Sequence, residues 1–134
     1  MPRQVTLDRA FEMIRAARAK AEEIKVPMNI AVVDAGANLV AFARMEGAWL
    51  GSIEIAQNKA FTSRAFDIVT GDLVDLCQPG AALYGLADAA QRKIVIFKGG
   101  IPLKDGDTVV GGIGVSGGHP DQDHDVAAAG AAAF

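Results

Sequence analysis

The sequence contains one cysteine and no excess of positive charge. Cys77 stands alone, so no internal disulfide can form, and its apolar neighbours are typical of a small buried side chain rather than a nucleophile. The 13 Lys and Arg residues are outnumbered by 16 Asp and Glu, which gives a net charge of -3 at pH 7. Basic residues are not interleaved with aromatic ones, as single-strand binding requires. We therefore expect no nucleic-acid partner.

Long hydrophobic runs are also missing. No stretch approaches the roughly 18 uninterrupted apolar residues of a membrane span, and no apolar signal core precedes the amphipathic pattern that begins at Leu7. We therefore expect no membrane association and a cytoplasmic location. The 134 residues, 51% of them hydrophobic, are enough for one core, and no linker or repeat divides them. A single domain over residues 1–134 is predicted.

The first half of the chain predicts a hairpin between two helices. Apolar residues follow a 3.6-residue period over the first helix, and a turn of Gly and Asn type separates two apolar runs rich in β-branched residues. Small residues at Ala56 and Ala60 give the second helix a face that can approach a sheet closely. The expected elements are a helix over residues 7–24, strands over 28–33 and 39–45, and a helix over 52–66.

The second half predicts further strands and a last helix. Thr70 is positioned to cap a short helix, and residues 81–91 fit either a packed loop or a helical turn. Glycines 111, 112 and 114 within one strand indicate a bulge or a very close neighbour. Antiparallel hairpins flanked by helices indicate an α+β architecture with a central sheet. The expected elements are a short helix over residues 70–77, strands over 93–98, 101–103 and 108–115, and an alanine-rich helix after His119.

The strongest site signal is a glycine-rich turn that leads into this last helix. Ser116, Gly117 and Gly118 precede His119, and a helix N-terminus presents unpaired N–H groups and a partial positive charge. The turn could therefore donate backbone hydrogen bonds to an anionic oxygen. The run lacks the Lys-Ser/Thr ending of a phosphate loop and a parallel βαβ context, so nucleotide binding is disfavoured. Tight strand packing is the structural alternative for its glycines.

Two cations and one carboxylate are further candidates. Arg44 and Lys59 could converge on the turn and hold a dicarboxylate or an enolate. Alternatively, Arg44 pairs with Glu46 or Glu54 and Lys59 is a solvated helix residue. Asp34 could serve as a general base, although a carboxylate before Gly36 is more often a turn former that accepts from its own backbone.

Two histidines lie in the acidic segment after the turn. His119 and His124 could ligate zinc or iron with nearby carboxylates. Their spacing of five does not place them on one helical face as a spacing of four would. The structural alternative is a capped helix start, with His119 as the cap and Pro120 at the first helical position.

The end of the chain bears on assembly. The small-residue surface of residues 127–133 and the apolar Phe134 at the last position are typical of a surface that packs against another subunit. We therefore expect a homo-oligomer.

Several distinctive sequence blocks are spread over most of the chain, at residues 33–42, 44–48, 56, 59–60, 99–103, 111–118 and 122–123. In this order, the blocks resemble the GlcG/HbpS family. The resemblance implies a profilin-like α+β fold with a five-stranded antiparallel sheet, higher homo-oligomers, and relatives that include haem-binding proteins and a domain attached to cobalamin adenosyltransferases. The matching motif positions include Asp34, Arg44, Lys59 and Asp123, whereas His124 replaces an acidic residue of the pattern.

Three functions are compatible with these residues. The favoured one is a module for a small anionic ligand, namely haem or a related tetrapyrrole, with propionates on Arg44 or Lys59 and a histidine near the iron. The second is a cofactor-independent isomerase, tautomerase or lyase that acts on a small organic acid, with Lys59, Asp34 or a histidine as base. The third is an accessory subunit whose role is assembly. The residues expected to bind ligand are Arg44, Lys59, Ser116, Gly117, Gly118, His119 and Asp123.

Overall fold

The structure, a computed structural model, describes residues 1–134 and places one antiparallel sheet between helices. The sheet has four strands in the order β2-β1-β4-β3. The predicted α+β class is confirmed, but the expected five strands are wrong by one. The elements are α1 (Leu7–Ile24), β1 (Asn29–Val33), β2 (Leu39–Arg44), α2 (Ser52–Ala65), the 3₁₀ helices η1 (Thr70–Leu73), η2 (Asp75–Cys77), η3 (Leu86–Asp88) and η4 (Ala90–Arg92), β3 (Gly100–Asp105), β4 (Thr108–Ser116) and α3 (Pro120–Ala132).

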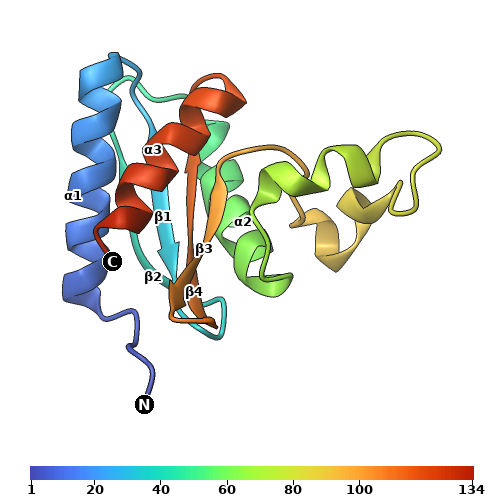
Figure 1. The fold of residues 1–134 in the computed structure, drawn as a ribbon. Helices are drawn as coiled ribbons and strands as arrows, with labels where there is room; N and C mark the ends of the chain where they lie inside the picture. Colours follow the sequence, from blue (N-terminus) through green and yellow to red (C-terminus); the bar gives the residue numbers. More distant parts are fainter.

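The helices cover the two faces of the sheet unequally. Helices α1 and α3 pack side by side on one face, and α2 lies alone on the other (Figure 1). Side chains along β1 alternate between the two faces of the sheet. Ile30 and Val32 join the large core under α1 and α3, while Ala31 and Val33 face α2. Helix α2 contacts β4 most extensively and barely touches β2. The edge strand β2 is therefore open on the α2 side.

Helix α1 has the predicted bounds. The Thr6 side chain accepts from the Arg9 amide at 3.2 Å, and Lys25 ends the helix in the left-handed conformation with φ of 61°. Its buried side chains recur every three or four residues and form the stripe that the sequence indicated. They are Ala10, Met13, Ala17 and Ala21.

Close packing of α2 on the glycines of β4 is the tightest contact in the fold. A Cβ on Gly112 would meet the Ala60 carbonyl at 2.7 Å, and a Cβ on Gly114 would collide with backbone atoms of Ala56 and Ala60. The glycines thus admit a close neighbour, one of the two roles expected for them, and the small-residue face of α2 is confirmed. Main chain lies against main chain here, so neither side can yield.

The strand expected over residues 93–98 does not form. This segment crosses the side of α2, where the Thr62 hydroxyl donates to the Lys93 carbonyl at 3.2 Å and accepts from the Val95 amide at 3.0 Å. The Lys93 carbonyl and the Val95 amide thereby have a side-chain partner rather than a neighbouring strand. The edge position belongs to β3 instead, which is longer than the expected 101–103 and pairs with β4 despite Pro102.

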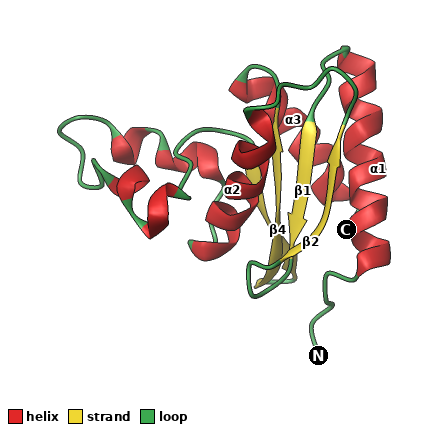
Figure 2. Cartoon of the chain, turned by 180° about the vertical axis from the view of Figure 1, so that it is seen from behind, coloured by secondary structure: helices red, strands yellow, loops and turns green.

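Residues 70–98, which we call the arm, connect α2 to β3, and the middle part of this segment projects away from the sheet (Figure 2). The predicted helix over residues 70–77 appears as two short 3₁₀ helices, and the segment left open at 81–91 contains two more. Thr70 is not a cap, because it is buried and its hydroxyl accepts from the Gly100 amide at 2.9 Å. Few side chains of the arm are buried. Its exposed large apolar side chains are Leu76, Leu83, Tyr84 and Phe97.

The C-terminal residues pack within the chain. Helix α3 lies against α1, and Phe134 packs on the core beneath the guanidinium of Arg3, which stands 4.6 Å from the ring centroid. This packing covers part of the small-residue surface on which the expected homo-oligomer rests, while Ala128 and Ala132 remain exposed. The homo-oligomer stays a prediction. None of the helices combines the length and the apolar character that crossing a membrane requires.

We predict that Gly114→Ala destabilises the protein by about 3 kcal/mol, because the added methyl group must push two rigid backbones apart. Urea unfolding followed by circular dichroism measures the loss. Gly51→Ala is the matched control: nothing lies within 4 Å of its added Cβ and its φ of -61° suits alanine, so its stability should stay within about 0.5 kcal/mol of wild type. Equal stability of the two variants would contradict the packing described here.

Candidate functional site

The glycine-rich turn is a sharp bend between β4 and α3. Strand β4 ends at Ser116, and the chain turns through Gly117 and Gly118 into the helix that begins at Pro120. A Cβ on Gly117 would meet the Pro27 carbonyl at 2.6 Å, so the bend lies directly against the start of β1. We call residues 116–119 the bend.

Helix α3 begins with a reciprocal cap. The Nδ1 atom of His119 accepts from the Asp121 amide at 3.1 Å, and the His119 amide donates to Oε1 of Gln122 at 2.9 Å. Pro120 occupies the first helical position, as the structural alternative predicted. His119 is nevertheless mostly exposed, so its ring also faces solvent.

The amides of the bend are already used by a carboxylate of the chain. Oδ1 of Asp123 accepts from the Gly118 amide at 2.9 Å, and Oδ2 accepts from Nζ of Lys59 at 2.8 Å. Asp123 is buried, with 3% of its side chain exposed. The anion bound at this helix N-terminus is therefore the Asp123 carboxylate of the chain itself and not an external ligand.

Lys59 is fully buried and is not the solvated helix residue considered above. Its ammonium donates to the Val115 carbonyl at 2.8 Å as well as to Asp123, and it stands 4.9 Å from the centre of the Phe97 ring. A Cβ on Gly99 would come within 2.5 Å of Nζ, so the space around the ammonium is closed. No pocket of the molecule is lined by Lys59.

Burial is the largest influence on the pKa values of Lys59 and Asp123. Removal from water lowers the pKa of Lys59 and raises the pKa of Asp123, and their mutual attraction opposes both shifts without cancelling them. The amides of Gly118 and Gly117 also favour the charged carboxylate. Keeping both charges inside thus costs free energy, so the pair is not a simple source of stability.

An open pocket of about 440 Å³ lies beside the bend. Three of the expected ligand-binding residues, Gly117, Gly118 and His119, line it, and the exposed Trp49 and Lys25 face them from other parts of the chain. We call it the bend pocket. Its lining residues are Lys25, Val26, Pro27, Gly47, Trp49, Gly117, Gly118, His119 and Gln122.

Arg44 does not join this pocket. It pairs with Asn29 in the strand register and lines a separate, smaller pocket with Arg18 and Glu46, whereas Lys59 is enclosed between α2 and β4. The expected convergence of the Arg44 and Lys59 cations on the bend is therefore wrong. Arg44 lies on the edge strand β2, which α2 hardly covers, and Lys59 points inward to meet Asp123.

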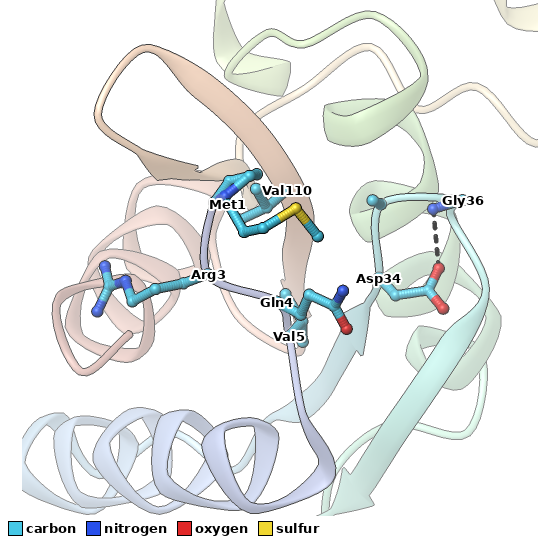
Figure 3. A pocket seen from close by; sticks show the side chains of 9 residues that line it. Met1, Arg3, Gln4, Val5, Asp34, Gly36 and Val110 are labelled. Atoms are coloured by element: carbon cyan, nitrogen blue, oxygen red, sulfur yellow. Dashed lines mark hydrogen bonds between the residues drawn. The ribbon is translucent and has the colours of Figure 1, made fainter.

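Asp34 lies at the opposite end of β1. Its Oδ1 accepts from the amides of Gly36 and Asn38, each at 2.9 Å, as expected of a turn former. It also lines a pocket of about 320 Å³ beside the N-terminal segment. Figure 3 shows the Arg3 guanidinium directed away from Asp34, so Arg3 does not pair with this carboxylate.

The two histidines do not share a site. His124 is half-buried, its Nδ1 has no hydrogen-bond partner, and it does not line the bend pocket that His119 faces. No group of three or more His, Cys, Asp or Glu side chains in the structure could hold a metal ion. A joint metal site of His119 and His124 therefore has no support in the geometry.

Sequence reasoning missed Trp49 and Lys25 as neighbours of the bend. Trp49 is the only tryptophan of the chain and is 65% exposed, and its carbonyl accepts from Nδ2 of the buried Asn29 at 3.0 Å. An isolated aromatic residue in a Gly-rich loop is the signal that could have suggested it. Lys25 carries no such signal, because its place depends on where α1 ends.

Comparison with known proteins decides the family. The family model described as "Haem degrading protein HbpS-like" matches residues 5–132. This chain belongs to that family. A 15.0 kDa protein of uncharacterised function from Citrobacter freundii, from the dhaT-dhaS intergenic region, is 44% identical over 89% of this chain and 84% of its own length. The resemblance drawn from the sequence blocks is thus confirmed.

Two further similar proteins have names that mention a corrinoid or haem. A corrinoid adenosyltransferase, PduO of Citrobacter freundii, is 44% identical over 87% of this chain, but the match spans only 35% of PduO. The solved complex of PduOC with haem is 39% identical, covers 97% of this chain and 94% of PduOC, and superposes with a TM-score of 0.93. The fold therefore occurs in a protein that holds haem.

We predict that Lys59→Met destabilises the protein by about 3–5 kcal/mol, because it leaves the Asp123 carboxylate buried without its cation. The raised pKa of Asp123 should rise further in this variant. A carboxyl that binds its proton more tightly when folded favours folding as pH falls, so the deficit should shrink between pH 7 and pH 4. Urea unfolding at several pH values measures this, and a deficit that grows on acidification would contradict it.

Proposed function

We propose that the protein binds haem or a related tetrapyrrole in the bend pocket. The observation that carries this proposal is the exposed His119 ring at the rim of a pocket that also contains an exposed tryptophan. Membership of the HbpS-like family and the haem-bound relative support the choice of ligand. Bound haem would supply a redox-active iron with a strong visible absorption band.

The imidazole of His119 fits an axial ligand after a change of tautomer. Its Nδ1 accepts a hydrogen bond from the Asp121 amide, so the neutral ring carries its proton on Nε2. Ligation through Nε2 requires that proton on Nδ1 instead. The Asp121 carboxylate, whose Oδ2 lies 3.6 Å from Nδ1, is then the available acceptor. Because Lys98 lowers the pKa of Asp121, this carboxylate stays ionised.

The remaining lining residues suit a planar macrocycle with acidic substituents. The Trp49 ring offers an apolar face for stacking, and the Lys25 ammonium can meet a propionate at the edge of the pocket. Lys25 thus takes the role first expected of Arg44. The anionic part of the ligand is recognised at the rim, since Asp123 already fills the amide site of the bend.

No observation favours the alternative of proton transfer on a small organic acid. Lys59 borders no pocket, and the Oδ1 atom of Asp34 is committed to two amides of its own turn. A general base must reach the proton that it removes. Two of the residues expected to act as bases, Lys59 and Asp34, therefore have structural roles that the geometry explains.

We predict that wild-type protein binds hemin with a shifted Soret band and that His119→Ala loses this shift, since the iron loses its axial nitrogen. Titration of the two proteins with hemin, followed by absorbance, measures the effect. His124→Gln is the matched control and should keep the wild-type spectrum, because His124 lies outside the pocket. No saturable binding by wild type would reject the proposed function, and loss of the shift only in His124→Gln would move the ligand to that residue.

We also propose that the protein forms a homo-oligomer through the arm rather than through the alanine-rich tail. The arm exposes Leu76, Leu83 and Tyr84, and Tyr84 is 67% accessible. A projecting segment with so few buried side chains gains little stability from its own chain, whereas contact with a second copy would bury these apolar groups (Figure 1).

We predict that Tyr84→Glu shifts the protein toward smaller species, because a buried interface tyrosine replaced by a charge costs about 2 kcal/mol or more per contact. Light scattering after gel filtration measures the mass. Asp88→Ala, an exposed change in the same arm, should leave the mass unaltered. A wild-type protein that is monomeric at micromolar concentration would refute the interface.

A further inference from the structure

We propose that Lys59 and Asp123 are positioning residues of the bend pocket, which hold the bend in the shape that presents His119. The consequence for ligand binding rests on the function proposed above. The positioning itself concerns this chain alone. In this role neither residue contacts the ligand, contrary to the expectation from the sequence.

The pair fixes the bend at three successive points. Before the bend, the Lys59 ammonium holds the Val115 carbonyl at 2.8 Å. Within it, Oδ1 of Asp123 holds the Gly118 amide at 2.9 Å. After it, Asp123 itself belongs to the first turn of α3 and is held by Lys59 at 2.8 Å. One ammonium and one carboxylate therefore connect the end of a strand, a bend and the start of a helix.

His119 takes its orientation from these attachments. Its amide donates to Gln122, which holds the residue to the first turn of α3, and its ring accepts from the Asp121 amide only while Nδ1 carries no proton. The Asp123 amide also donates to the His119 carbonyl at 3.0 Å. Because Asp123 anchors that turn to Lys59, a change in the pair is transmitted to the imidazole through the bend.

Direct action of the pair on a ligand is excluded by its surroundings. Lys59 is 0% exposed and Asp123 is 2% exposed, and neither lines a pocket. A Cβ on Gly99 would touch both Nζ of Lys59 and the Val115 carbonyl, so no spare volume surrounds the ammonium. Burial also disfavours both charges, which makes stability a poor account of their presence.

Two uncharged double variants separate positioning from stability. Lys59→Met with Asp123→Asn removes both charges but keeps a side-chain oxygen that can accept from the Gly118 amide. Lys59→Met with Asp123→Leu removes the charges and that acceptor. Neither leaves an unpaired buried charge, so both are designed to fold, and Lys59→Met with Asp123→Ala provides a second variant without the acceptor if the leucine disturbs packing.

The first measurement is hydrogen exchange of the Gly118 amide by NMR. We expect exchange about tenfold faster than wild type in the leucine variant and near wild type in the asparagine variant, because only the latter keeps the hydrogen bond. The second measurement is hemin titration, in which the leucine variant should bind about tenfold more weakly with an altered Soret position. Met13→Ala, which opens a cavity in the core under α1, is the control for general destabilisation. It should change neither the Gly118 exchange rate nor the hemin titration.

Equal Gly118 exchange in the asparagine and leucine variants would overturn the positioning role, as would unchanged hemin spectra in a leucine variant whose Gly118 amide is released. Failure of wild type to bind hemin would reject the proposed function instead. The exchange comparison needs no ligand, so it still decides whether the pair holds the bend.

Discussion

The site depends on how closely α2 approaches β4. Because Gly112 and Gly114 carry no side chains, the backbone of α2 lies directly on the strand, and Lys59 enters the interior at the end of the glycine run. A larger spacing would leave the ammonium short of both Val115 and Asp123. The same contact that builds the core thus places a charge inside it. The bend beyond the strand takes its shape from that charge.

Most of the fold could be predicted from local sequence patterns, and the wrong predictions have one cause in common. Helix α1 and the hairpin follow from periodicity and turn residues that act within a few positions, so their predicted bounds agree with the structure to about one residue. Residues 93–98 have strand-like composition, yet their backbone partner is the Thr62 side chain, some thirty positions earlier. The composition of a segment indicates that it is apolar and extended. It does not indicate which group will form hydrogen bonds with its backbone.

The elements around the bend could be predicted from the sequence, whereas the contacts of Arg44 and Lys59 could not. The bend, the helix start and His119 could be identified because Gly, Pro and capping residues are adjacent in sequence. The pairing of Lys59 with Asp123 joins positions 64 apart, and Trp49 reaches the pocket from a loop between β2 and α2. Arg44 and Lys59 look alike as cations in the sequence. Only the sheet topology separates an exposed edge position from a buried one.

An internal carboxylate in the bend changes what the pocket can recognise. Free amides at a helix start would select a small anion, but here Asp123 already accepts from the Gly118 amide, which leaves that amide no hydrogen bond for a ligand. What remains exposed is an imidazole, an indole and one ammonium at the rim. Such a set favours a flat aromatic ligand whose charge lies at its edge and whose centre can accept a nitrogen donor. These are the features on which the proposed binding of a tetrapyrrole rests.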